Sequence, residues 1–219
     1  MRFGKLMMAW LVAGYALVTP ALAVEYFVAP DGADSNDGSS WNQAFATISN
    51  ALAQVGVDTV TVSNGTYTLG TTLTVTNGVT IQSFGNGVTG GLANAEYTIV
   101  QRTGGTGGGK FRICGITHTN AVLDGLTITG GMGRGVHGFG VNMTGGTVRN
   151  CIVRDNGDLW NASAAGKASG GGIYMTGGVV SNCIVQGNAV VEDYAAGIYA
   201  RGVSRIVDSR ILDNRHLAG

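Results

Sequence analysis

The chain has 219 residues, of which 38 are glycine and only two are proline, and its 13 basic residues balance 13 acidic ones. Charged residues make up 12 % of the sequence, below the roughly 25 % that is usual. This composition excludes a disordered chain, which would be richer in charge, and collagen, which needs glycine at every third position. The zero net charge also argues against a nucleic-acid binder, which normally has a basic excess.

The first 23 residues have the composition of a secretory signal peptide. Arg2 and Lys5 precede an apolar run at positions 6–18, and a small-x-small cleavage site ends at Ala23. The run is shorter than the roughly 20 residues of a membrane span. We therefore expect cleavage after Ala23, a secreted or cell-surface protein, and no transmembrane segment in the rest of the chain.

Residues 24–58 are predicted to form a strand, an acidic turn and a helix. The turn carries Asp31, Asp34, Asn36 and Asp37, and it resembles a calcium-binding loop that is one residue short of the D-x-[DN]-x-[DN]-G pattern. These four residues are candidate metal ligands, and hydrogen bonding within the turn is the alternative. We expect that no cofactor is required and that calcium is the metal that could bind.

A capping helix is predicted directly after this turn. Ser39 or Ser40 can cap its N-terminus, and apolar residues then recur at helical spacing on one face. These residues are Trp41, Ala44, Phe45, Ile48, Leu52 and Val55. Further strands are predicted at 59–63, 72–76, 79–82, 98–101 and 111–114.

Internal repetition dominates the rest of the chain. The segments 150–156 and 182–188 match almost letter for letter, with a third copy at 208–214 and a degenerate one at 125–131. The equivalent positions 126, 151, 183 and 209 are 25, 32 and 26 residues apart, and a short segment that opens with glycine precedes the three later copies, at 140–143, 172–175 and 197–200. A repeat of this period, made of short strands and Gly/Asn turns, predicts a solenoid in which each repeat forms one coil.

Within each copy the second and fourth residues are small or apolar, whereas the residue between them varies. The pairs are Leu126 and Ile128, Cys151 and Val153, Cys183 and Val185, and Ser209 and Ile211. Such alternation points these side chains inward, so equivalent residues should stack ~4.8 Å apart in successive coils. Asn156, Asn188 and Asn214 close the copies, and we expect them to adopt the left-handed conformation and to hydrogen-bond one another.

These repeats resemble those of the pectin-lyase-like superfamily. Gly-Gly-Ile at 171–173 and Val-Gln-Gly-Asn at 185–188 also resemble the repeats of polymorphic outer-membrane proteins, with valine where those repeats have phenylalanine. The resemblance implies an all-β fold, a right-handed parallel β-helix over 59–219 with a short N-terminal capping helix that covers strand edges at that end. The repeats run to the end of the sequence, so we expect a missing C-terminal region or a partner to cover the other end.

Cys114, Cys151 and Cys183 are an odd number of cysteines, so at least one has no partner within the chain. Their spacing does not match a metal site. Because Cys151 and Cys183 fall at inward positions of the repeats, we expect free, buried thiols that act as small apolar side chains. The alternative is a bridge between these two.

The resemblance also implies that any chemistry lies on the outer face of one sheet and in its neighbouring loops. A lyase of this superfamily would need several carboxylates for calcium and an arginine or lysine as the base. The candidate catalytic residues are Arg154, Asp155 and Asp158, with Lys167 nearby, and exposed turn residues are the alternative reading of this set. The polygalacturonase pattern is absent, which makes His137 a loop residue.

An insert at 157–169 carries Trp160, which could stack on sugar rings or fold back over the adjacent coil. We expect a secreted or cell-surface β-helix scaffold, adhesin-like or glycan-binding and without catalysis in this segment. Its expected partner is a polysaccharide or cell-surface glycan, and not nucleic acid. The alternative function is a polysaccharide lyase or glycoside hydrolase of the same superfamily, with a lyase as the first choice.

Overall fold

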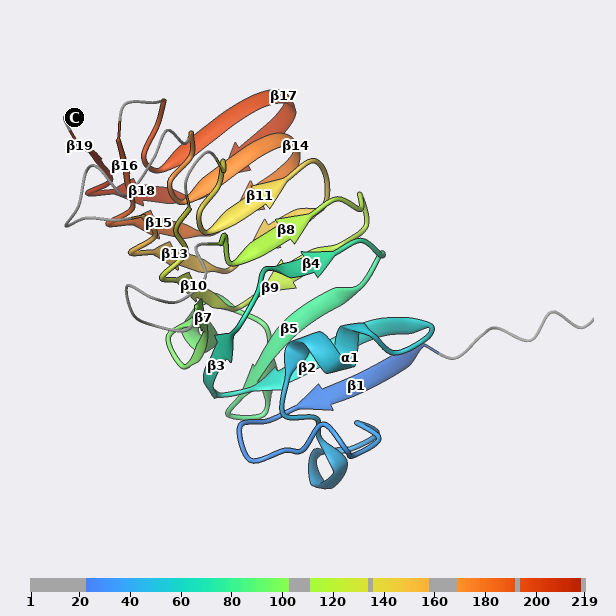
Figure 1. Ribbon diagram of the computed structural model, residues 1–219. Helices are drawn as coiled ribbons and strands as arrows, with labels where there is room; N and C mark the ends of the chain where they lie inside the picture. Colours follow the sequence, from blue (N-terminus) through green and yellow to red (C-terminus); the bar gives the residue numbers. More distant parts are fainter. Residues whose placement is uncertain (1–22, 103–110, 134–135, 158–168, 192–193, 218–219) are drawn as a thin grey trace, which may run out of the picture.

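The computed structural model describes residues 23–102, 111–133, 136–157, 169–191 and 194–217. Residues 1–22, which hold almost all of the expected signal peptide, lie outside this part. The described chain consists mostly of short strands that stack from the N-terminal end, in blue, to the C-terminal end, in red (Figure 1). No described helix is long and apolar enough to cross a membrane.

The strands form two large sheets and one small one. The eleven-stranded sheet contains β1 (Val24–Val28), β2 (Val57–Ser63), β4 (Leu73–Val75), β5 (Thr80–Gly85), β6 (Val88–Thr89), β8 (Cys114–Ile116), β9 (Val122–Asp124), β11 (Val141–Met143), β12 (Thr147–Arg149), β14 (Ile173–Ser181) and β17 (Ile198–Val207). The six-stranded sheet contains β3 (Gly65–Leu69), β7 (Thr98–Arg102), β10 (Thr127–Thr129), β13 (Ile152–Arg154), β15 (Ile184–Gln186) and β18 (Arg210–Leu212). The third sheet pairs β16 (Ala189–Val191) with β19 (Arg215–Leu217).

The repeat copies stack on one another in the predicted register. Thr127, Ile152, Ile184 and Arg210 hold the same position in their copies, and they pair in that order across β10, β13, β15 and β18. The segments that open with glycine stack in the same way in β11, β14 and β17. All of these pairings are parallel. The curled, mostly parallel sheets are therefore compatible with the predicted β-helix.

Four of the five strands expected between residues 59 and 114 coincide with β2, β4, β5 and β7. The strand predicted at 111–114 is misplaced, because β8 begins at Cys114. Ile113 precedes β8 and bonds two neighbouring segments. Its N–H donates to the carbonyl oxygen of Phe139, and its own carbonyl oxygen accepts from the N–H of Leu73, each at 2.9 Å. The sequence did not predict six of the described strands: β3, β6, β9, β12, β16 and β19.

The helix predicted from the apolar spacing at 41–55 is wrong in its extent. A short 3-10 turn, η1 (Trp41–Gln43), is followed by extended residues, and α1 (Ile48–Leu52) begins only after Thr47. Phe45 explains the interruption, since its backbone pairs in parallel with β1. The hydrogen bonds of this sheet edge replace those of a helix. The N-cap is Thr47, whose hydroxyl oxygen accepts from the N–H of Asn50 at 3.2 Å, and not Ser39 or Ser40.

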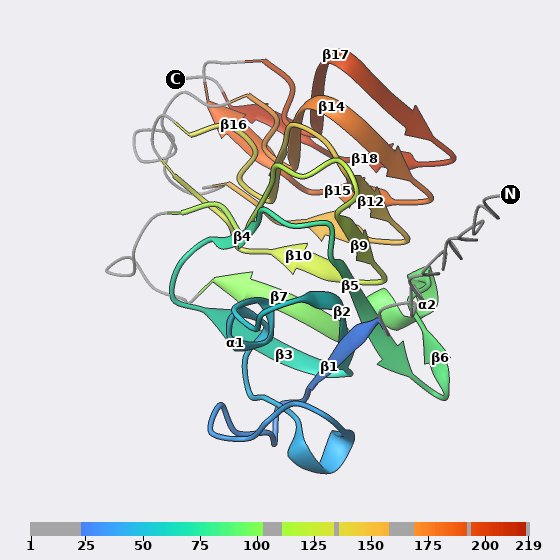
Figure 2. The ribbon, with the colours of Figure 1, turned by 90° about the vertical axis from the view of Figure 1, so that its right-hand side faces the viewer.

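Helical residues are not confined to the N-terminal segment. A four-residue helix, α2 (Leu92–Ala95), follows β6 and lies with it to one side of the stack (Figure 2). The carbonyl oxygen of Ala95 accepts from the hydroxyl of Thr127 at 2.6 Å. This excursion therefore covers an outward position of β10, which is why Thr127 is buried.

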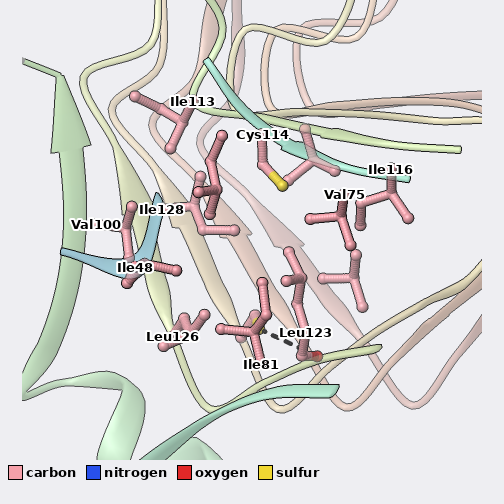
Figure 3. Packing of buried hydrophobic residues seen from close by; sticks show 14 of the residues in the cluster. Ile48, Val75, Ile81, Val100, Ile113, Cys114, Ile116, Leu123, Leu126 and Ile128 are labelled. Atoms are coloured by element: carbon pink, nitrogen blue, oxygen red, sulfur yellow. Dashed lines mark hydrogen bonds between the residues drawn. The ribbon is translucent and has the colours of Figure 1, made fainter. Parts of the chain in front are cut away.

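The apolar core lies between the curled sheets. Side chains from α1 and from strands of several coils point into it, including Ile48, Val75, Ile81, Val100 and Leu123 (Figure 3). The inward residues predicted in the repeats are buried in the first three copies, 125–131, 150–156 and 182–188. The last copy differs, with Ser209 only half-buried and Ile211 49 % exposed.

The predicted asparagine ladder is present. The Nδ2 group of Asn156 donates to Oδ1 of Asn188, and Nδ2 of Asn188 donates to Oδ1 of Asn214, each at 2.9 Å. The expected left-handed conformation of these asparagines is wrong. The preceding residue makes the turn instead, with a φ of 54° at Asp155 and 64° at Gly187, so the asparagine side chain is free to turn inward.

Candidate functional site

The acidic turn is held together by its own hydrogen bonds. The carboxylate of Asp34 accepts from the N–H of Ala46 at 3.0 Å and from the N–H and hydroxyl of Thr47, each at 2.9 Å. Asp37 accepts from the hydroxyl and the N–H of Ser39, and these two bonds lower the pKa of its carboxyl group. The hydrogen bonds of Asp34 therefore hold the turn against Ala46 and Thr47, the two residues that precede α1.

The other two candidate metal ligands add little to a metal site. Asn36 donates from Nδ2 to the carbonyl oxygen of Ala44 at 2.9 Å, and Asp31 is exposed. Within the described ranges, no group of three or more His, Cys, Asp or Glu side chains is arranged to hold a metal ion. The local Asx-type bonding that was the alternative for this turn is seen at Asp37, which accepts from Ser39 two residues on, whereas Asp34 and Asn36 bond the segment 44–47.

Only two of the candidate catalytic residues can be placed. Nη1 of Arg154, in β13, lies 3.2 Å from Oδ2 of Asp155, and both side chains are exposed. Asp158, Lys167 and the candidate sugar-binding residue Trp160 lie outside the described residues. An exposed ion pair of this kind contributes at most about 1 kcal/mol.

A buried carboxylate lies elsewhere, at the junction with the α2 excursion. Asp124 accepts from Nε of Arg149 at 2.7 Å, from Nδ2 of Asn150 at 2.6 Å and from the N–H of Gly91 at 3.0 Å. Its side chain is 9 % exposed. Gly91 lies just before α2, whereas Arg149 and Asn150 belong to the next coil. Asp124 therefore links the α2 excursion to the stacked strands.

The three cysteines are free and buried. Burial raises the pKa of the Cys114 thiol to about 12 and that of Cys151 well above its ordinary value. The sulfur of Cys151 lies 3.1 Å from the carbonyl oxygen of Arg149, and that of Cys183 lies 3.2 Å from the carbonyl oxygen of Ser181. The raised pKa values keep the Cys114 and Cys151 thiols protonated, whereas the interaction with Cys151 lowers the pKa of Cys183.

A pocket of about 210 Å³ lies beside α1 and β3. Its lining includes Pro30, Thr47, Thr66, Tyr67, Leu69 and Thr71. Burial raises the pKa of Tyr67 to about 12, and its hydroxyl donates to the carbonyl oxygen of Ser63 at 2.9 Å. The lining contains no carboxylate or basic side chain, and Tyr67 is its titratable group.

The most distinctive surface feature is an aromatic ladder, formed by His137, Tyr174 and Tyr199. The rings of His137 and Tyr174 stack with centroids 4.6 Å apart and an interplanar angle of 16°. Those of Tyr174 and Tyr199 stack at 5.3 Å and 8°. Tyr174 and Tyr199 are paired in register in β14 and β17, so the ladder runs across the coils.

The ladder is fixed at its first ring and open at its last. Nδ1 of His137 accepts from the N–H of Ser169 at 3.0 Å, and the carbonyl oxygen of His137 accepts from Nδ2 of Asn142 at 3.3 Å. At the other end Tyr194 packs against Tyr199 at 6.0 Å and 35° and is 70 % exposed. Stacking covers ring faces of His137, Tyr174 and Tyr199, and the exposed ring of Tyr194 lies next to the last of them.

Sequence reasoning missed this ladder, although a signal was present. Gly-Ile-Tyr occurs at 172–174 and again at 197–199. Tyr174 lies between the buried residues Ile173 and Met175, and strand alternation therefore places it on the outer face. A repeated outward tyrosine in stacked coils predicts stacked rings.

Comparison of the chain with protein-family models, with curated proteins and with solved structures finds no match. The functional reading of this protein therefore depends on its own residues and geometry.

Proposed function

We propose that the protein is a right-handed parallel β-helix of the pectin-lyase-like superfamily that acts as a secreted or cell-surface scaffold and binds glycans. The stacked repeats and the asparagine ladder support the β-helix. The amino-terminal basic and apolar pattern supports export. In this architecture α1 and the acidic turn cap the first coil, as the resemblance implies.

The aromatic ladder is the observation that supports glycan binding. Tyrosine combines an apolar ring with a hydroxyl group, which matches the apolar faces and hydroxyl edges of sugars. Thr144 and Thr176 lie two residues after Asn142 and Tyr174, and strand alternation places them on the same face as the ladder. A linear glycan lying across the coils would meet equivalent groups at intervals of ~4.8 Å.

The chemistry of the ladder favours binding over cleavage. Glycoside hydrolysis uses a pair of carboxyl groups that flank the scissile bond, and His137, Tyr174, Tyr194 and Tyr199 supply none. A glycan bound there would be held by hydroxyl hydrogen bonds and by contact with the exposed ring of Tyr194.

Affinity electrophoresis through gels that contain neutral or anionic polysaccharides, with and without calcium, tests the proposal. Tyr194→Ala and Tyr199→Ala should each weaken retardation about three- to tenfold. Tyr97→Ala is the matched control, since Tyr97 is 60 % exposed and lies outside the ladder. Circular dichroism checks that each variant is folded.

Three results would overturn this proposal. The first is an equal loss of binding in the Tyr97 control, and the second is no binding to any polysaccharide. The third is the release of unsaturated sugars that requires calcium and disappears in Arg154→Ala, which would establish the polysaccharide lyase in its place.

A further inference from the structure

The pocket beside α1 and β3 lies along an edge of β3 and not over one face of its sheet. Thr66 and Thr68 are exposed, whereas Tyr67 and Leu69 are buried, yet all four line the pocket. Side chains from both faces of a strand can meet one space only at the edge of that strand. Residues 46–49, which include the start of α1, line the pocket as well, and Figure 2 shows α1 beside β3.

This edge of β3 presents backbone groups to the pocket. Among the described strands, β3 pairs only with β7. The N–H of Gly65 donates to the carbonyl oxygen of Tyr97, just before β7, at 2.7 Å. Because the backbone groups of successive strand residues point to alternate edges, the N–H and C=O groups of Thr66 and Thr68 point away from β7. Each of these two residues therefore offers a donor and an acceptor to a ligand in the pocket.

Hydroxyl groups add to the hydrogen-bonding capacity of the pocket. Ser49, Thr66 and Thr71 line it and are exposed, and within the described part of the chain their hydroxyl groups make no hydrogen bond. A hydroxyl group can both donate and accept. Pro30 and Leu69 give the same lining apolar surface. The pocket thus combines free hydrogen-bonding groups with apolar contact area.

The surroundings of the pocket favour a small, uncharged ligand. None of the lining residues carries a formal charge. Asp31 follows the lining residue Pro30, and its charge contributes to the raised pKa of Tyr67, so a carboxylate lies close enough to repel an anion. The volume of about 210 Å³ is below the roughly 300–1,000 Å³ of pockets that bind drug-sized ligands.

We propose that this pocket is a second binding site, which takes a single neutral sugar unit. The hydroxyl groups of the sugar pair with the backbone groups of Thr66 and Thr68 and with the free side-chain hydroxyls, while its C–H groups contact Pro30 and Leu69. The pocket shares no residue with the aromatic ladder. The proposal therefore does not depend on glycan binding by the ladder.

Titration with glucose, galactose and mannose, followed by two-dimensional NMR of the backbone amides, tests the proposal. At least one of these sugars should give saturable shifts at residues 47–49 and 66–71. Glucuronate has the ring of glucose with an added carboxylate, and it should bind about two- to fivefold more weakly than glucose because of the charge of Asp31.

Gly70→Leu is the decisive variant. Gly70 lines the pocket, and a Cβ atom there would meet no atom within 4 Å, so the larger side chain can occupy free space. It should weaken sugar binding about tenfold or more. Gly115→Leu is the matched control, since a Cβ atom at Gly115 meets only Cγ2 of Thr72 at 3.9 Å and the residue lies outside the pocket.

A hexasaccharide of the sugar that binds distinguishes the two sources of a sugar unit. Tighter binding than that of the monosaccharide indicates the end of a glycan chain, and binding that is no tighter indicates a free monosaccharide. Tyr199→Ala should leave the shifts unchanged, so a failure of glycan binding by the ladder is distinguishable from a failure of this proposal.

Four results would overturn the proposal. The first is the absence of shifts at these amides with every neutral sugar, including the case in which a capped, uncharged tetrapeptide binds along β3 instead. The second is glucuronate binding as tight as that of glucose. The third is undiminished binding in Gly70→Leu, and the fourth is an equal loss of binding in Gly115→Leu.

Discussion

Asn188 shows how single buried side chains connect the coils. Its Nδ2 group donates to Oδ1 of Asn214 and to the carbonyl oxygen of Val153, each at 2.9 Å. Its Oδ1 atom accepts from the N–H of Asn156 at 3.1 Å and from Nδ2 of the same residue at 2.9 Å. One fully buried amide thus satisfies groups in three successive coils.

Asn188→Ala should lower the free energy of unfolding by about 2–4 kcal/mol, because it leaves buried donors and acceptors without partners. Urea denaturation measures the change. Asn182→Gly in the same coil is the control: Nδ2 of Asn182 donates to Oδ1 of Asn150 at 2.8 Å, the residue is exposed, and glycine accepts its positive φ of 48° without strain. Its loss should cost no more than about 1 kcal/mol, and equal effects in the two variants would contradict this account.

The buried thiols predict a loss of stability at alkaline pH. The pKa of Cys114 is about 12 in the folded protein and about 8.5 in an unfolded chain, so only the unfolded form ionises between these values. The stabilisation is complete below the unfolded pKa and is lost as pH rises towards 12, by up to about 1.4 kcal/mol per pH unit. Urea denaturation from about pH 8 to pH 10 should show this slope, and Cys114→Ala should make it shallower. An unchanged slope in that variant would count against the assignment.

At the scale of elements, α1 is stabilised by packing and not by its length. Five residues are too few for an isolated helix in water. Ile48 and Ala51 are buried, and α1 contacts β1 and β2. The apolar spacing predicted helix at α1 correctly. It could not show that Phe45 pairs with Val28 of β1, because these two residues are 17 positions apart in the sequence.

Ile48→Ala should therefore destabilise the protein by about 2–4 kcal/mol, through lost burial and the cavity left behind. Val55→Ala should change stability by less than about 0.5 kcal/mol, since Val55 is 95 % exposed. Thermal or urea denaturation of the two variants distinguishes the short helix α1, in which Ile48 is packed, from the longer helix predicted by the apolar spacing, in which Val55 would also be packed. Comparable losses would support the longer helix.

For the whole molecule, stability should decrease along the stack towards the last coil. In a repeat array each unit is held mainly by its neighbours. The coil that contains β13 lies between β10 and β15, whereas β18 has β15 on one side only among the described strands. The exposure of Ile206 and Ile211 follows from the same lack of a described neighbour.

Hydrogen exchange measures this gradient. Bonded amides in β18 should exchange about tenfold or more faster than those in β13, because local opening of the last coil breaks fewer contacts. Equal protection in β13 and β18 would contradict a stability gradient.

The sequence by itself determined the repeat register, the inward rows and the asparagine ladder. These features follow from recurrence. Asn156, Asn188 and Asn214 stack because each comes two residues after a strand of the same length, and those strands alternate in the same phase. Only the tertiary structure decided the break before α1, the burial of Asp124 beneath Gly91 and the aromatic ladder. Each depends on contacts between segments or on the orientation of side chains, which period-two alternation does not specify.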